Sequence, residues 1–149
     1  MKSYEEVKNI LSDIEPTGAM YEKLTIEDIP NLEKILKEPE PWLASRAVFS
    51  LSKLHSDRGN EILYSLVDDP RVEIRVSLAS AARQLSPDLY EKITGKLIGD
   101  KEPGVRKFVY LSVPLQASPD LIIQLKRAFE KEELPDLQNI LKEKIPGFQ

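Results

Sequence analysis

An internal repeat of 31 residues is the feature that most restricts the fold of this chain. When the sequence is shifted by that length, apolar residues align in columns, one residue from each of three copies. The clearest columns are Leu43 with Ile74 and Val105, Ala47 with Leu78 and Val109, and Leu51 with Ala82 and Val113. Within each copy these positions are spaced i, i+4, i+8, so they lie on one face of an α-helix. The repeat therefore predicts helical units stacked with this face buried.

The segments around the columns are also helical in pattern, and no segment keeps the polar–apolar alternation of a half-buried strand. Each unit is interpreted as a helix, a short turn and a second helix. We expect an all-α fold, a short right-handed α-solenoid of about four helical hairpins with an N-terminal capping helix. Its single domain divides into a cap over 1–25, repeats over 26–56, 57–87 and 88–118, and a divergent C-terminal hairpin over 119–149.

Single residues mark the expected helix ends. Ser3 and Glu6 form a capping box at the start of the first helix, and the segment 15–18 (Glu-Pro-Thr-Gly) is expected to end that helix. Pro119 and Pro135 begin the helices of the last hairpin. Pro114 is expected to end the second helix of the third unit early, because proline has no backbone N–H.

Composition excludes several classes of site. The 149 residues contain no cysteine and one histidine, His55, so thiolate chemistry and a histidine-rich metal site are excluded, and we expect no metal and no cofactor. The formal charge of −4 argues against bulk attraction to nucleic acid. Because we find neither a signal-type apolar stretch nor a membrane-length apolar run, we expect a cytoplasmic protein without membrane contact.

The turns between paired helices carry a common polar pattern. Asp69 and Pro70 predict a helix N-cap followed by a proline in the first turn. The segments 100–103 and 38–41 occupy the same place in the other units. An arginine follows six residues after the second and third acids, at Arg75 and Arg106, whereas the first unit has Ala44.

These turns resemble those of the HEAT-repeat family, through 69–75 (Asp-Pro-Arg-Val-Glu-Ile-Arg) and 100–106 (Asp-Lys-Glu-Pro-Gly-Val-Arg). The resemblance implies a structural ladder between neighbouring repeats, formed by Asp69, Arg75, Asp100 and Arg106. It fails at the first unit, where Ala44 replaces the arginine. The resemblance also implies that the second helices line a concave face.

The second-helix segments 41–54, 71–85 and 104–117 together carry seven basic residues and one acidic residue, which leaves −10 for the rest of the chain. Aromatic and arginine side chains are typical of interface hot spots. We therefore predict a partner-binding strip on the concave face. Its residues are Trp42, Arg46, Phe49, Lys53, Ser77, Ser80, Arg83, Gln84, Lys107, Phe108 and Leu111.

Structural interpretations of the same residues stay open. Phe49, Phe108 and Leu111 also fit a wide apolar core face, since a second helix touches neighbours on two sides. Trp42 fits either a rim anchor or a staple against the N-terminal cap. Among the acidic pairs, Asp68 and Asp69 are interpreted as capping residues, and Glu132 and Glu133 as a solvated helix surface.

We predict a non-enzymatic protein–protein interaction module, an adaptor that binds an acidic or amphipathic segment of another protein. One alternative is a helical-repeat nucleic-acid binder or a DNA glycosylase-like protein, for which the acidic chain is unfavourable. Another is an accessory subunit of a lyase-type modifying complex, as among the HEAT-like phycobilin lyase proteins. The sequence does not indicate the partner or the oligomeric state.

Overall fold

The computed structural model describes residues 1–12 and 18–147, and within these ranges the chain forms ten α-helices and no strand. The helices are α1 (Tyr4–Leu11), α2 (Gly18–Glu22), α3 (Ile29–Ile35), α4 (Pro41–Leu54), α5 (Asp57–Ser65), α6 (Val72–Ala81), α7 (Pro87–Leu97), α8 (Pro103–Ser112), α9 (Pro119–Lys131) and α10 (Pro135–Lys144). Short 3₁₀ turns cover Ile26–Asp28, Leu66–Asp68 and Ala82–Gln84. The predicted all-α class is confirmed.

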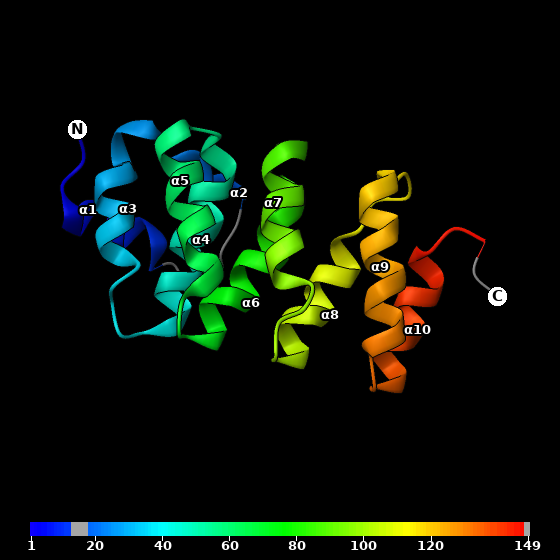
Figure 1. Ribbon diagram of the computed structural model, residues 1–149. Helices are drawn as coiled ribbons and strands as arrows, with labels where there is room; N and C mark the ends of the chain where they lie inside the picture. The colour runs from blue at the N-terminus through cyan, green and yellow to red at the C-terminus, as the bar shows by residue number, and fades with distance from the viewer. Residues whose placement is uncertain (13–17, 148–149) are drawn as a thin grey trace.

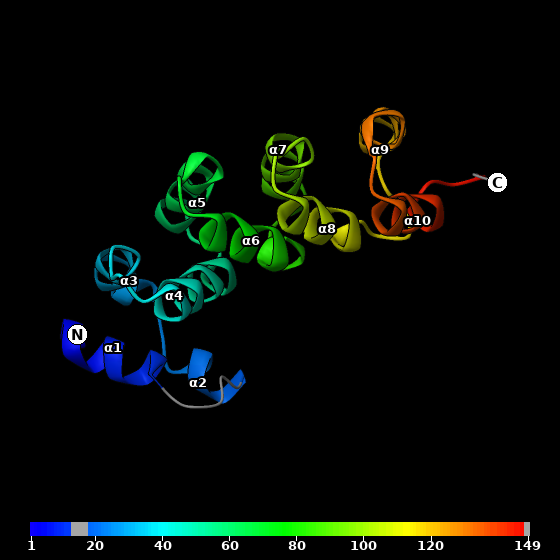
Figure 2. The same cartoon turned by 90° about the horizontal axis from the view of Figure 1, so that it is seen from below.

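The helices from α3 onward lie in two rows (Figures 1 and 2). Helices α3, α5, α7 and α9 follow one another along one side, and we call them the first-helix row. Helices α4, α6, α8 and α10 form the second-helix row, in which each helix packs directly against the next. Helix α1 contacts α2, α3 and α4, so the N-terminal segment covers one end of both rows.

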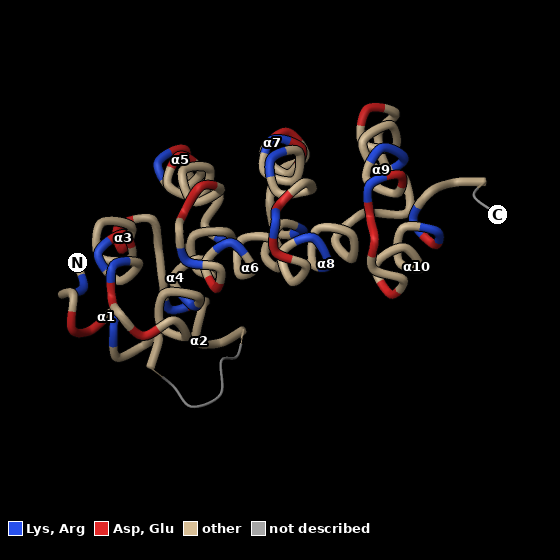
Figure 3. Tube along the Cα trace, turned by 60° about the horizontal axis from the view of Figure 1, so that its bottom comes forward, with Lys and Arg blue, Asp and Glu red and all other residues tan. Residues whose placement is uncertain are grey.

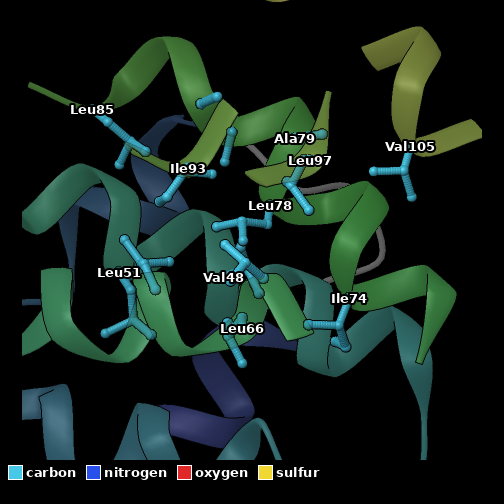
Figure 4. Packing of buried hydrophobic residues seen from close by; sticks show 14 of the residues in the cluster. Val48, Leu51, Leu66, Ile74, Leu78, Ala79, Leu85, Ile93, Leu97 and Val105 are labelled. Atoms are coloured by element: carbon cyan, nitrogen blue, oxygen red, sulfur yellow. The ribbon is translucent and has the colours of Figure 1, made fainter. Parts of the chain in front are cut away.

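The repeated columns form the core between the rows, and Figure 4 shows part of this packing. All nine residues of the three columns are buried. Burying a side chain such as Leu78 contributes about 1.5–3 kcal/mol through the area removed from water. The same helical face is therefore buried in every copy, as the repeat predicted.

The last hairpin continues these columns. Leu137, Leu141 and Ile145 are buried at positions that follow Val105, Val109 and Val113 by 32 residues. A fixed shift of 31 residues predicts that this hairpin is divergent, because a single extra residue moves each of its columns out of register.

Several helices begin at the expected prolines. Pro119 and Pro135 are the first residues of α9 and α10, and α8 ends at Ser112, ahead of Pro114, so these predictions are confirmed. The predicted N-cap at Asp69 is wrong. Helix α6 begins at Val72, and the Asp69 carboxylate instead accepts a hydrogen bond from the backbone N–H of Arg71.

The first helix begins with the predicted capping box between Ser3 and Glu6. The expected end signal lies mostly outside the described residues, which resume at Gly18. Lys2 forms a 3.0 Å ion pair with the buried Asp28, and this pair holds the start of the chain against the turn before α3. Within residues 1–12 and 18–147, no helix combines the length and apolar character that crossing a bilayer requires.

Replacement of Leu78 by alanine is expected to lower the free energy of unfolding by about 2–5 kcal/mol, because it leaves a cavity in the fully buried centre of α6. Urea unfolding followed by circular dichroism measures this loss. Leu115→Ala is the matched control, because Leu115 is 96% exposed and its truncation should change stability by less than about 0.5 kcal/mol. Equal effects of the two substitutions would contradict the assigned core.

Candidate protein interface

Acidic residues recur in the turn that joins the two helices of each pair. Asp69, Asp100 and Glu132 each accept a hydrogen bond from the backbone N–H two residues ahead, at distances of 2.9, 3.0 and 3.3 Å. They are separated by 31 and 32 residues, as the buried columns are. The same local turn is therefore built three times along the chain.

The arginines of the second helices join these turns to one another. Arg75 donates to the Asp69 carbonyl at 2.8 Å and binds the Asp100 carboxylate with two nitrogens, at 2.8 and 3.2 Å. Arg106 repeats the arrangement one unit further on, with the Asp100 carbonyl at 3.0 Å and Glu132 at 2.9 and 3.0 Å. Each guanidinium therefore connects its own turn to the carboxylate of the next.

Glu132 is a correction to the sequence interpretation, which placed it on a solvated surface. Its residue exposure is only 6%, and besides Arg106 it accepts a 2.8 Å hydrogen bond from the Tyr110 hydroxyl. Gln138 takes the place of the missing next arginine and donates to the Glu132 carbonyl at 2.6 Å. Searching the sequence with a shift of 32 residues from Asp100 would have found both residues.

The surroundings of these carboxylates set their pKa values. Burial raises the pKa of Asp100, but hydrogen bonds from Arg75 and the Glu102 N–H outweigh burial, so the pKa lies below its usual value. Glu132 behaves in the same way, with burial outweighed by Arg106, Tyr110 and the Leu134 N–H. Burial and the bond to Glu132 both raise the pKa of Tyr110. The acids are therefore held in the charged form.

At the first unit the pattern changes, because Ala44 has no side chain that can reach the next turn. Asp69 pairs instead with Arg71, whose guanidinium also donates to the Leu36 carbonyl at 2.6 Å. Glu38 accepts hydrogen bonds from Tyr4 and from Lys8. The bond to Glu38 raises the pKa of Tyr4 to about 12. Helix α1 thus supplies Glu38 with the partners that a preceding unit would have provided.

On α4, the N-terminal segment contacts two residues of the predicted strip, Arg46 and Lys53. Arg46 donates to the Leu11 carbonyl at 2.7 Å, and its guanidinium lies 5.0 Å from the ring centre of Trp42. Trp42 is itself 48% exposed. Lys53 lies 5.7 Å from the ring centre of Tyr21 in α2, and Phe49 is half-buried against the core. Arg46 and Lys53 therefore contact the N-terminal segment, while the side chains of Trp42 and Lys53 remain exposed.

On α6 and in the 3₁₀ turn that follows it, two predicted strip residues make contacts within the protein. Ser77 is buried and shares a 2.5 Å hydrogen bond with Ser45 of α4. Arg83 donates to the carbonyls of Ser112 and Val113, at 3.0 and 3.4 Å, at the end of α8. Ser80 is half-buried and Gln84 is exposed. Ser77 is therefore too buried to meet a partner, whereas Arg83 is exposed and also contacts the end of α8.

Helix α8 carries further exposed residues of the strip. Lys107 is exposed, Phe108 is 36% exposed and Leu111 is 42% exposed, and the exposed Leu115 lies in the bend that follows the helix. The structure also brings Val76 of α6 close to α8, because a Cβ placed on Gly104 would lie 3.8 Å from Val76. Val76 was missed, although it precedes Ser80 by four residues and so shares its helix face.

The lowered pKa of Glu132 predicts that its contribution to stability depends on pH. A carboxylate with a lowered pKa stabilises the fold above its unfolded pKa, near 4.3, and this contribution is lost as the pH falls through the folded pKa. Glu132→Gln should cost about 2 kcal/mol at neutral pH through weaker bonds to Arg106 and Tyr110. This loss of stability should be smaller at a pH below the unfolded pKa than at neutral pH, and urea unfolding at the two pH values measures the difference. Glu130→Gln, at an exposed site near the end of α9, is the control, and a loss of stability that does not change with pH would contradict the prediction.

Charge reversal at Arg83 should also destabilise the protein, because a glutamate would face the carbonyl end of α8. We expect a loss of about 1 kcal/mol, which corresponds to a melting temperature lower by roughly 3 °C. Lys92→Glu makes the same charge change at an exposed site on α7 and should leave the melting temperature unchanged. A melting temperature unaffected by Arg83→Glu would indicate instead that Arg83 is free to bind a partner.

Among the described residues, no three His, Asp or Glu side chains come together as metal ligands. A comparison with protein-family models finds none that matches the chain, and a search of curated proteins finds no match.

Proposed function

We propose that the chain is a short right-handed HEAT-like α-solenoid of four hairpins, α3–α4 to α9–α10, that works as a non-enzymatic protein-interaction module. The repeated turn at Asp69, Asp100 and Glu132 and the continuous buried columns support this architecture. In such a stack each unit contacts only its neighbours, and the row of second helices offers an extended surface to a partner.

The observation that carries the proposed function is the exposed apolar stripe on α8. Phe108 and Leu111 are spaced i, i+3 on this helix and are 36 and 42% exposed, and Leu115, in the bend after the helix, is 96% exposed. Exposed apolar residues that are contiguous, rather than scattered, mark interaction sites, and aromatic anchors dominate their binding energy. Lys107 beside this stripe provides a charge for an acidic group of the partner.

The contacts of the basic residues favour an amphipathic protein segment over a nucleic acid. Tracking a phosphate backbone needs many free cations. Arg71, Arg75 and Arg106 bind carboxylates, and Arg83 binds the carbonyls at the end of α8. The exposed Lys107 is the cation closest to the stripe in sequence. We therefore propose a partner helix whose apolar side covers Phe108 and Leu111 and whose acidic edge lies near Lys107.

The test is affinity purification of the tagged protein from its own cells, followed by mass spectrometry, for the wild type and two double variants. Phe108→Ser with Leu111→Ser should reduce recovery of a specific partner at least about tenfold, since two anchors are lost. Ile123→Ser with Tyr64→Ser removes two exposed apolar residues from the first-helix row and should leave recovery unchanged. Partners retained by the α8 variant would refute the proposed surface.

A further inference from the structure

A groove of about 710 Å³ lies between α7 and α9, on the side of α8 opposite Phe108 and Leu111. Figure 2 shows these two helices side by side in the first-helix row, with α8 below and between them. The volume lies within the range of about 300–1,000 Å³ that is typical of ligand pockets. It is large enough for a few side chains of a peptide.

Glycines open one wall of this groove. Gly95 and Gly99 line it from α7 and the turn that follows. A Cβ on Gly99 would have no atom within 4 Å, and a Cβ on Gly95 would meet only the side chain of Gln124, at 3.8 Å. Ile98, Ala128 and Leu134 add apolar surface to the lining. The groove can therefore accept an apolar side chain.

The charges in the lining favour an anionic occupant. Figure 3 shows basic and acidic positions interspersed along α7 and α9. Among the described residues, the ion pairs within the groove involve its acidic side chains more completely than its basic ones. Asp100 and Glu132 are already bound by Arg75 and Arg106.

Three basic side chains of the lining, Lys101, Arg127 and Lys131, have no ion-pair partner among the residues that the structure describes. Glu133 is the one carboxylate of the lining without such a partner among those same residues. Three free cations against one free carboxylate, around an apolar lining, complement an apolar side chain flanked by carboxylates.

We propose that the α7–α9 groove is a second binding site, which takes an acidic peptide segment of a partner protein with one apolar residue inserted beside Gly99. This site is separate from the α8 stripe and goes beyond the proposed function. The carboxylates of the peptide contact Lys101, Arg127 and Lys131, and the ladder pairs below them keep Asp100 and Glu132 from repelling it.

The experiment selects peptides from a phage-displayed random library on the immobilised full-length chain and measures the affinity of labelled, enriched peptides by fluorescence anisotropy. We expect sequences with an apolar residue flanked by Asp or Glu, whose affinity falls as salt is added. Arg127→Gln with Lys131→Gln should weaken binding at least about tenfold, as expected when steering and contact charges are lost. Lys92→Gln with Lys126→Gln removes two exposed charges outside the groove and is the matched control.

A second variant tests the shape of the groove without changing its charge. Gly99→Leu fills the space beside α7 and meets no atom at its Cβ, so the fold should be retained and peptide binding lost. Enrichment without acidic residues, or equal binding by wild type and Gly99→Leu, would overturn the proposal. Peptides lost only in Phe108→Ser with Leu111→Ser would refute the groove but support the α8 surface, so the two proposals fail separately.

Discussion

The two-sided binding of Arg75 and Arg106 constrains how the helical pairs are placed along the chain. Each guanidinium holds the carbonyl of its own turn and grips the carboxylate of the next turn with two nitrogens. The fixed fork of a guanidinium accepts a carboxylate in a narrow range of orientations, so the pair sets both spacing and rotation. Removing two charges from water offsets much of the attraction, so such pairs add little net stability. The buried columns supply the stabilisation, and the arginines set the register.

The ends of the second-helix row differ because the arginine is missing there. At the start, Ala44 cannot bind Asp69, which forms an ion pair with Arg71 instead. Tyr4 and Lys8 of α1 donate hydrogen bonds to Glu38. The same N-terminal segment contacts Arg46 and Lys53 of α4, although Trp42 and Lys53 remain exposed. At the far end Gln138 keeps the bond to the turn carbonyl but offers no charge to a following unit. Among the described residues of α6, α8 and α10, the large apolar side chains that are exposed are Phe108 and Leu111, both on α8.

Helix α8 lies between the two proposed sites and connects them physically. One face carries Phe108 and Leu111, and the opposite side carries Arg106 and the buried Tyr110, which line the α7–α9 groove. The ion pair between Arg106 and Glu132 neutralises the floor of that groove and leaves the cations of α9 free. The ion pair between Arg106 and Glu132 thus helps to give the groove its positive charge.

The sequence by itself determined the all-α class, the buried columns and most helix ends, because helical periodicity and proline act locally and repeat in every copy. It placed Phe108 and Leu111 opposite the core stripe of α8 but left open whether they are surface anchors or core, and the structure shows them 36 and 42% exposed. Only the tertiary structure decided which charges are free. Arg46 and Arg83 follow the same surface pattern as Lys107, but they bind carbonyls of Leu11 and Ser112, which are distant in sequence. Glu132 likewise became buried because Arg106 and Tyr110 reach it from the preceding unit. Whether a charge meets solvent or a partner depends on the packing of distant segments, and local spacing carries no information about that packing.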